Sequence, residues 1–232
     1  MPDFARYAIY YLPEPGPLAS FGAAWLGWDV EAGTEVPHPQ VEGLPRPLAE
    51  ITATPRKYGF HGTVKPPFRL AEGHDAEGLV VAAVKLAARL EPVELDGLEL
   101  SRLGSFLALT PQGSKAQLSA LGALASESVQ GLDAFRAPAP QSELDRRRKA
   151  GLSARQESYL QQWGYPYVME DFRFHLTLSG RLSAIDAPTV EDALRPLVTP
   201  VMPEPFRIES LCLCGEDAEG RFHLVKRLPL GG

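Results

Sequence analysis

The sequence contains only two cysteines, no excess of basic residues and no long apolar run. Cys212 and Cys214 stand two residues apart on an expected strand and so face the same side, a poor arrangement for a disulfide and an incomplete one for zinc. We expect both to be small core residues in a reducing compartment, with the cytoplasm as the default location. The apolar run near the N-terminus is too short for a signal-peptide core, and no stretch approaches the roughly 18 apolar residues that span a bilayer.

Basic residues are also outnumbered, since 23 Lys and Arg face 29 Asp and Glu, for a net charge of −6 and a pI near 5.4. Dedicated DNA-binding and membrane-surface proteins usually carry a basic excess, so neither partner is expected. The sequence lacks a P-loop, a dinucleotide glycine fingerprint and an H-E-x-x-H string, which removes the commonest nucleotide and zinc sites. We therefore expect no metal and no cofactor. A small phosphorylated substrate stays compatible, because an acidic protein can carry a local basic cleft.

The pattern of apolar residues predicts a mixed α+β fold for the 232 residues. Strands are expected at 6–12, 58–64, 93–100, 105–110, 172–179, 206–214 and 221–228, and helices at 18–28, 76–90, 114–129, 142–163 and 190–198. Residues 31–56 are rich in proline and glycine and read as an irregular connection. Whether this segment and residues 131–150 cover a cleft is not readable from the sequence.

The two halves of the chain show the same order of elements. The first half contains a strand F-H-G-T-V followed by a helix and two strands. The second half contains a strand F-H-L-T-L followed by a helix and two strands. His61 lies 45 residues before Phe106, and His175 lies 47 residues before Phe222. This self-similarity predicts an internal duplication. We expect one domain over residues 1–232 with lobes near 1–112 and 113–232, some elements exchanged between them, and two antiparallel sheets that line a central cleft, with helices outside and a pseudo-twofold axis.

Both repeated strands are expected to have an apolar back and a polar front, because strand side chains alternate between faces. The fronts carry a histidine, a threonine and cations: Lys57, His61, Thr63 and Lys65 in the first strand, and Arg173, His175 and Thr177 in the second. Phe222-His223 has valine at the position of the threonine, and His38 and His74 lie in loops without such a partner. These three histidines are expected to be structural or exposed.

Two facing imidazoles suit the hydrolysis of a phosphodiester, which needs a base for water and an acid for the leaving oxygen. The threonine hydroxyls could donate to the phosphate oxygens, and Lys57, Lys65 or Arg173 could offset their charge. Which histidine is the base stays open, because the site is nearly symmetric. The competing interpretation is structural: threonines at good strand positions and histidines with local hydrogen bonds.

Four segments carry a resemblance to a known family: Y-G-F-H-G-T-V-K-P-P-F (58–68), F-R-A-P (135–138), W-G-Y-P-Y-V (163–168) and F-R-F-H-L-T-L (172–178). The paired His-x-Thr segments resemble the two-histidine (2H) phosphoesterases, which include the LigT-like RNA ligases and cyclic phosphodiesterases. The longer strings resemble a branch of bacterial proteins associated with phosphonate operons. The resemblance covers nearly the whole chain. It implies catalytic His61 and His175, phosphate contacts from Thr63 and Thr177, and roles for Arg136 and Tyr167 that spacing does not explain.

The resemblance implies a metal-independent hydrolase for a cyclic phosphodiester. A ribose cyclic phosphate of phosphonate metabolism is the favoured substrate, and a nucleoside or RNA-terminal cyclic phosphate is the second. The alternative is a non-catalytic module that binds a phosphorylated nucleotide or an RNA end in the same cleft. A third interpretation, RNA binding through the basic run 146–149, would require a strongly salt-dependent affinity.

Overall fold

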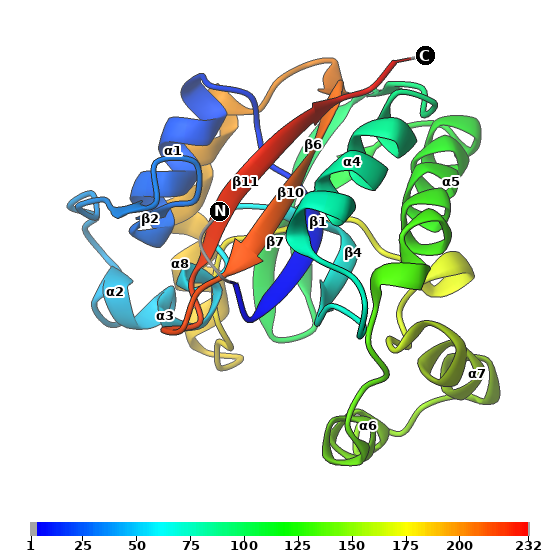
Figure 1. The fold of residues 1–232 in the computed structure, drawn as a ribbon. Coiled ribbons are helices and arrows are strands. Elements are labelled where there is room, and N and C mark those ends of the chain that lie inside the picture. Colours follow the sequence, from blue (N-terminus) through cyan, green and yellow to red (C-terminus); the bar gives the residue numbers. More distant parts are fainter. Residues whose placement is uncertain (1–3, 232) are drawn as a thin grey trace.

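The computed structural model describes residues 4–231 as strands and helices around one large sheet (Figure 1). The strands are β1 (Arg6–Tyr11), β2 (Trp28–Asp29), β3 (Thr34–Glu35), β4 (Gly62–Phe68), β5 (Val93–Leu95), β6 (Gly97–Leu103), β7 (Phe106–Gln112), β8 (Leu176–Thr177), β9 (Phe206–Ile208), β10 (Ser210–Glu216) and β11 (Phe222–Pro229). The α-helices are α1 (Pro17–Leu26), α2 (Leu48–Ile51), α3 (Ala53–Arg56), α4 (Ala76–Ala87), α5 (Lys115–Gly131), α6 (Gln141–Arg148), α7 (Ala154–Trp163) and α8 (Asp186–Val198). Short 3₁₀ helices are η1 (Asp133–Phe135), η2 (Met169–Asp171) and η3 (Thr199–Val201).

The large sheet has seven strands in the order β11-β10-β1-β4-β8-β7-β6, all paired antiparallel. Strands β2–β3 and β5–β9 form two small sheets. The predicted mixed α+β fold is confirmed, but the two expected sheets are joined into one through the contact between β4 and β8. The halves exchange elements, because β6 and β7 from the first half join β8, while β10 and β11 from the second half join β1.

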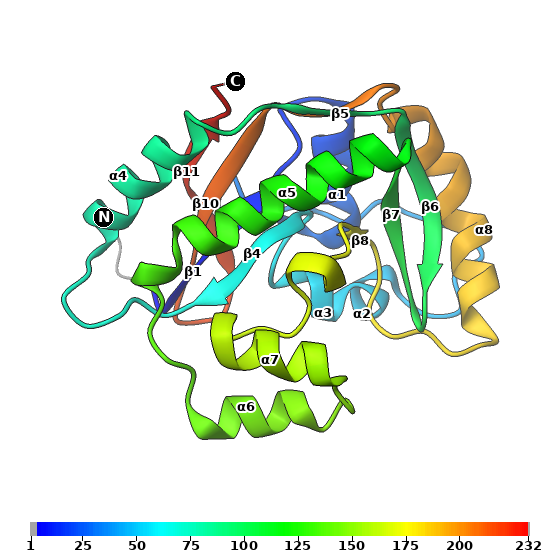
Figure 2. The same cartoon turned by 90° about the vertical axis from the view of Figure 1, so that its right-hand side faces the viewer.

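Helices pack on the sheet where their apolar faces are buried. Figure 2 shows α4 and α5 crossing the part of the sheet that contains β11, β10 and β4, and α8 lying beside β7 and β6. Asp75 caps α4 by accepting from the Gly78 amide, and Ser114 and Gln117 form a capping box at the start of α5. These caps explain why both helices begin close to where the sequence predicts. The α6–α7 pair projects away from the sheet (Figures 1 and 2).

β4 and β8 meet at a single register pair, Gly62 with Leu176, at the glycine of the F-H-G-T-V segment. A Cβ atom added at Gly62 would lie 2.4 Å from Cζ of Phe174, whose ring is buried against Phe206 and Tyr11. The absence of a side chain at this position therefore lets the two motif strands approach each other.

Replacing Gly62 with alanine should lower the free energy of unfolding by about 1–3 kcal/mol, because the buried Phe174 ring must move to make room. Chemical denaturation of the variant measures this loss. Gly122→Ala is the matched control: a Cβ there meets nothing within 4 Å, and the position is helical, so a gain of up to about 1 kcal/mol is expected. A Gly62→Ala protein as stable as the wild type would contradict the close approach.

A β-bulge changes the expected face pattern of β4. Tyr10 is opposite Thr63 and Ile9 is opposite Lys65, so Val64 is an extra residue on this strand. Thr63 and Lys65 therefore point to opposite faces, and the prediction that Lys65 shares a face with the motif threonine is wrong. Lys65 is 1% exposed, and its ammonium donates to the Val129 carbonyl at 2.9 Å near the C-terminus of α5. Its Nζ also lies 3.5 Å from an Asp133 carboxylate oxygen.

The other two predicted cations lie outside regular strands. The expected strand 172–179 is present only as β8, so alternation does not place Arg173, whose guanidinium donates to the carbonyls of Glu170 and Phe172. Lys57 is exposed and follows α3 rather than lying on β4. The predictions that these two cations share a strand face with the motif histidines are therefore wrong.

Two further sequence predictions concern the core and the membrane. Cys212 and Cys214 lie on β10, and both are buried with free thiols, as expected for small core residues. Within residues 4–231, none of the helices combines the length and the apolar character needed to cross a bilayer.

Candidate active site

His61 is held by hydrogen bonds at both ring nitrogens. Its Nδ1 lies 2.9 Å from the carbonyl oxygen of Gly59, so this nitrogen carries a proton and donates it. In the neutral ring, Nε2 then accepts from the Thr63 hydroxyl at 3.0 Å. The imidazole lies over the Tyr10 ring, with centroids 4.0 Å apart. In the neutral ring, these contacts set the tautomer, with the proton on Nδ1 and the lone pair of Nε2 directed at the Thr63 hydroxyl.

His175 has the corresponding first contact. Its Nδ1 lies 2.8 Å from the carbonyl oxygen of Arg173, two residues before it, as Gly59 stands two residues before His61. The Phe106 ring packs against the imidazole, with centroids 5.6 Å apart. In both motifs, therefore, a backbone carbonyl occupies Nδ1 and leaves Nε2 to face other groups.

The register of β4 and β8 brings the two motifs together. Gly62 pairs with Leu176 in an antiparallel ladder, and each of these residues stands between the histidine and the threonine of its motif. The two motifs therefore run alongside each other in opposite directions, with the histidine end of one beside the threonine end of the other. Cβ atoms on a diagonal of such a ladder are about 7–8 Å apart, so the two imidazoles can flank one phosphate-sized group.

The charge of His175 acts on His61, as expected for two rings that share one site. The pKa of His61 is lowered from 6.5 to about 4, first by desolvation and also by repulsion from His175, while the bond to the Gly59 carbonyl opposes this shift. His61 is consequently neutral at pH 7.

This lowered pKa predicts a pH-dependent stability. The unfolded chain takes up a proton at His61 near pH 6.5, whereas the folded chain does so only near pH 4, so the contribution of His61 to stability is lost as the pH falls between these values. Replacing His61 with glutamine should remove this part of the dependence. We expect the unfolding free energy of the wild type to fall more steeply than that of the variant between pH 6.5 and 4. Identical slopes in urea titrations would contradict the shift.

A cavity of about 400 Å³ opens beside His61 and Thr177. It is lined by residues from α3, the segment between α3 and β4, the β6–β7 turn with the start of β7, β8 and the segment after β8: Thr54, Pro55, Tyr58, His61, Ser105, Phe106, Thr177, Ser179, Gly180 and Arg181. Its size is within the range of about 300–1,000 Å³ that is typical of sites for small molecules. Thr63 and His175 are not among its lining residues, although Phe106 contacts both the cavity and the His175 ring.

Arg136 and Tyr167, which the family resemblance singles out, lie outside the residues that line this cavity. The Arg136 guanidinium donates to both carboxylate oxygens of Asp133 and to the Gln162 carbonyl at the end of α7. Tyr167 is 43% exposed and packs edge-on against Tyr165. Arg136 thus ties α7 to the Asp133 that also lies beside Lys65, and any contact of either residue with substrate stays a prediction.

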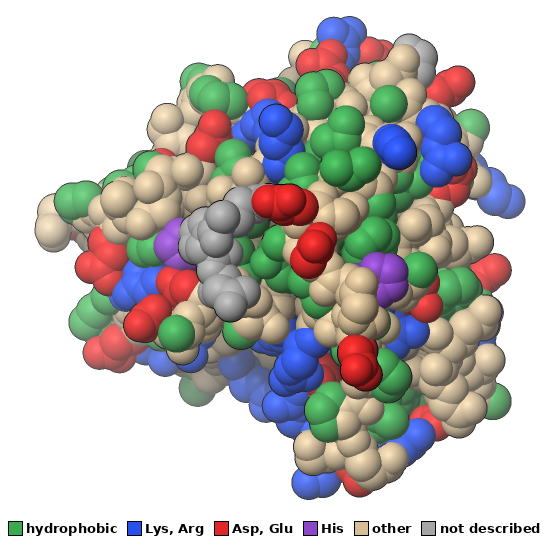
Figure 3. Space-filling view, in the orientation of Figure 1, with side chains coloured by type: hydrophobic (Ala, Val, Ile, Leu, Met, Phe, Trp, Pro, Cys, Tyr) green, Lys and Arg blue, Asp and Glu red, His purple; other side chains and the backbone are tan. Residues whose placement is uncertain are grey.

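Two of the four cations in the basic run 146–149 form ion pairs. Arg147 pairs with Glu143, and Arg148 pairs with Asp145 and Glu157. Side chains of both signs are interspersed over the face seen in Figure 3. These pairings do not favour the interpretation of the run as an RNA-binding surface.

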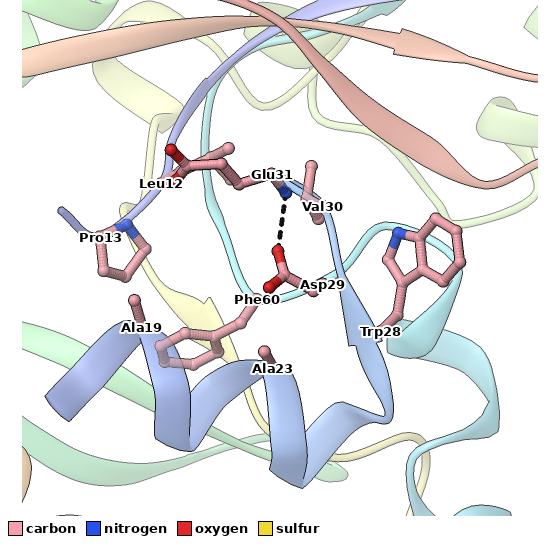
Figure 4. A pocket seen from close by; sticks show the side chains of 9 residues that line it. All are labelled: Leu12, Pro13, Ala19, Ala23, Trp28, Asp29, Val30, Glu31 and Phe60. Carbon is pink, nitrogen blue, oxygen red and sulfur yellow. Dashed lines mark hydrogen bonds between the residues drawn. The ribbon is translucent and has the colours of Figure 1, made fainter. Parts of the chain in front are cut away.

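A second, smaller cavity of about 40 Å³ lies between α1 and the segment after it (Figure 4). Its only carboxylates are Asp29, which accepts from the Glu31 amide at 2.9 Å, and Glu31 itself. Apolar side chains such as Leu12 and Phe60 supply most of its lining. It offers no base or nucleophile comparable to the His61 site. Across the described residues, no group of three or more His, Cys, Asp or Glu side chains is arranged to hold a metal ion.

Sequence reasoning missed Tyr58, Phe106 and Arg181 as cavity residues. The repeat contained a signal for one of them, because Phe106 and Phe222 take equivalent places in the two halves. Phe106 packs on His175, and Phe222 packs on Tyr58 at 5.5 Å between ring centroids. The repeat spacing therefore marks aromatic residues beside the site.

Residues 63–223 match the protein family described as "Protein of unknown function (DUF1045)". The chain belongs to the DUF1045 family. Two curated relatives of this DUF1045 chain are named Ribose 1,5-bisphosphate phosphokinase PhnN. The protein from Janthinobacterium sp. (strain Marseille) is 38% identical over 99% of this chain and 52% of the relative. The protein from Laribacter hongkongensis (strain HLHK9) is 36% identical over 79% of this chain and 42% of the relative. The chain spans about half the length of these relatives or less.

Among solved structures, this DUF1045 chain is similar to a protein described as a phosphoesterase, with 17% identity, 99% and 100% coverage of the two chains and a TM-score of 0.42. It is also similar to E. coli LigT complexed with 3'-AMP, with 15% identity, the same coverages and a TM-score of 0.43.

Proposed function

We propose that the chain is a phosphoesterase that hydrolyses a cyclic phosphodiester of ribose, with His61 and His175 as a base and an acid. The observation that supports the proposal is the antiparallel pair of Gly62 with Leu176, because each of these residues stands between the histidine and the threonine of its motif. A phosphate between the rings would then meet two Nε2 atoms and two hydroxyls.

The electrostatics of His61 favour one order of the two roles. Two imidazolium ions side by side repel each other, so the pair disfavours a state in which both rings are charged. His61 is the neutral ring, because desolvation lowers its pKa to about 4 and its Nδ1 proton is held by Gly59. His61 is therefore the base, and His175 enters the reaction as the acid.

The proposed step balances within the site. The oxygen of water attacks phosphorus while its proton passes to Nε2 of His61, and the phosphorus–oxygen bond to one ribose oxygen breaks as His175 donates its Nε2 proton to that oxygen. The Thr63 hydroxyl turns from Nε2 of His61 to the bound phosphate, which frees Nε2 for the proton of water, and Thr63 and Thr177 then donate hydrogen bonds to the non-bridging oxygens. The product is a phosphate monoester, and exchange with solvent restores both histidines.

The names of the curated relatives favour ribose as the sugar. In a cyclic phosphate that bridges O1 and O2 of ribose, cleavage of the bond between phosphorus and O2 leaves a phosphate on O1. The ribose 1,5-bisphosphate in those names also carries a phosphate on O1. We do not extend their kinase activity to this chain, because its sequence has no G-x-x-x-x-G-K-[ST] loop to hold nucleotide phosphates. The chain covers only 52% and 42% of these relatives, so their name describes proteins about twice as long.

The test is turnover of ribose 1,2-cyclic phosphate and of 2′,3′-cyclic nucleotides with EDTA present, followed by phosphorus NMR. We expect a monoester product at an unchanged rate with EDTA, and ribose substrates preferred over nucleotides. Complete loss of the activity with EDTA would overturn the metal-independent mechanism. Tight binding without turnover would support the alternative, a module that only binds phosphorylated ligands.

A further inference from the structure

A third cavity, of about 560 Å³, lies between α5, α7 and η2, and Figure 2 shows α7 beside α5. It is on the side of α5 that does not pack on the core. Its described lining residues are Ser119, Gly122, Ala123, Ser126 and Gln130 of α5, Tyr159 and Trp163 of α7, and Met169 and Glu170 of η2. None of these residues lines the cavity beside His61, so this cavity has a wall of its own.

Two aromatic side chains of α7 form one side of this cavity. Tyr159 and Trp163 are four residues apart, so they lie on the same face of the helix. Both side chains are only partly buried. Within residues 4–231, neither ring stacks on another aromatic ring or has a cation over its face, whereas Tyr165 and Trp28 each have an arginine there. The two rings are therefore open to contact with a ligand.

The cavity carries one negative charge. Glu170 is the only charged side chain among its described lining residues. The Tyr159 hydroxyl donates to the Glu170 carboxylate, and this hydrogen bond lowers the pKa of Glu170, so the group is ionised at neutral pH. Arg155 also acts on this charge, but its guanidinium is bound to both carboxylate oxygens of Asp171, at 2.8 and 3.0 Å. The lining therefore disfavours an anion and favours a cation.

The remaining lining is small or polarisable. Gly122 lies within α5, and a Cβ added there would meet nothing within 4 Å, so this part of the cavity is open. Met169 lies on the opposite side, where its sulfur accepts from the Gln130 amide at 3.8 Å. Sulfur and aromatic rings make favourable contacts with methyl and methylene groups. A single carboxylate offers too few oxygen ligands for a divalent metal ion. The fitting cation is therefore an organic one.

We propose that this cavity binds a small alkylated ammonium ion, with its charge next to the rings of Tyr159 and Trp163 and the carboxylate of Glu170. Tryptophan attracts a cation over its face more strongly than the other aromatic residues, and groups of aromatic side chains recognise quaternary ammonium ions. The site goes beyond the proposed hydrolysis and does not depend on it, because the two cavities share no lining residue. Binding can be measured without any turnover.

The test compares choline with 3,3-dimethyl-1-butanol, which has the same shape but a carbon atom in place of the charged nitrogen. Each is titrated into the full chain at neutral pH, and NMR follows the indole N–H signals. We expect choline to bind with a dissociation constant of about 1 mM or lower, the scale for so small a ligand. It should bind about 10-fold more tightly than the neutral alcohol. The Trp163 signal should shift, and those of the buried Trp25 and Trp28 should not.

Three variants locate the ligand. Trp163→Leu should weaken choline binding about 10-fold, and Trp163→Phe should recover part of the loss. Glu170→Gln should weaken it about 2- to 5-fold, because this carboxylate is exposed to solvent. Gly122→Leu should block binding, since the new side chain fills the open part of the cavity. Glu127→Gln is the matched control, because Glu127 is exposed on α5 but does not line the cavity, and it should leave the affinity unchanged.

Equal affinities for choline and the neutral alcohol would overturn the proposal, because apolar contact alone would then hold the ligand. A Trp163 signal that does not respond to choline would also overturn it. Choline binding that survives both Trp163→Leu and Gly122→Leu, in variants that circular dichroism shows to be folded, would place the ligand elsewhere. Failure of the proposed hydrolysis would leave each of these results unchanged.

Discussion

The His61→Ala variant and the His175→Ala variant should each turn over a ribose cyclic phosphate about 10³-fold more slowly than the wild type. Each variant loses one proton-transfer group, and such a group typically contributes about 10²–10⁴-fold to the rate. The double variant should be little worse than either single one, since base and acid act in one step. Steady-state kinetics with circular dichroism to confirm folding would measure this. The fold should persist in both variants, because neither ring is fully buried.

His74→Ala provides the control for the histidine variants. His74 is exposed in the loop before α4, contacts Phe135 and is not among the residues that line the cavity. Its replacement should leave kcat/KM within about 2-fold, as expected for a surface position. If a His61 or His175 variant retained the wild-type rate, that histidine would lose its assigned role.

Replacing Lys65 with alanine should lower the free energy of unfolding by about 2–4 kcal/mol, because a long buried side chain is lost and a cavity is left. The ammonium also satisfies the Val129 carbonyl in the last turn of α5, where a positive charge is favourable. Burial lowers the pKa of Lys65 to about 8 despite the nearby Asp133, so the charge itself is costly in this position. Denaturant titrations at pH 7 would measure the loss.

Lys65→Met separates packing from charge. Methionine fills most of the same volume, so this variant should be more stable than Lys65→Ala. Asp133 keeps its bidentate partner Arg136 in both variants. Because Lys65 points away from Thr63, kcat/KM should remain within about 5-fold of the wild type in the methionine variant. A loss as large as that of the histidine variants would show that the buried amine reaches the substrate after all.

The sequence predicted that the two motif segments meet, because this meeting depends on local rules. The repeated Phe-His-x-Thr order singled out both segments, and the glycine between His61 and Thr63 allows β4 to approach β8 closely. The catalytic role of both histidines stays a prediction. The fold class followed from the strand and helix periodicities. The sequence did not predict which hairpins, β6–β7 or β10–β11, are exchanged between the halves. Each hairpin has the same apolar pattern whichever strand it pairs with.

The cations around the site were predicted less well, for two physical reasons. The prediction that side chains alternate between the faces of a strand assumes an unbroken strand. The extra residue Val64 in β4 reverses the face on which Lys65 lies, so the Lys65 ammonium donates to a carbonyl of α5 and does not face the motif threonine. Second, the cavity walls come from turns and segment ends whose positions depend on tertiary contacts. Arg181 reaches the site only because Ile51 and Ser105 hold its neighbours, and no spacing in the sequence encodes those bonds.

The most direct measurement is nitrogen NMR of the imidazole rings during titration with inorganic phosphate, with the two ring signals assigned by the alanine variants. One anion between the rings should shift Nε2 of His61 and of His175 with the same midpoint, and either alanine variant should weaken the response of the remaining ring. Separate midpoints, or a response of only one ring, would contradict a shared phosphate site.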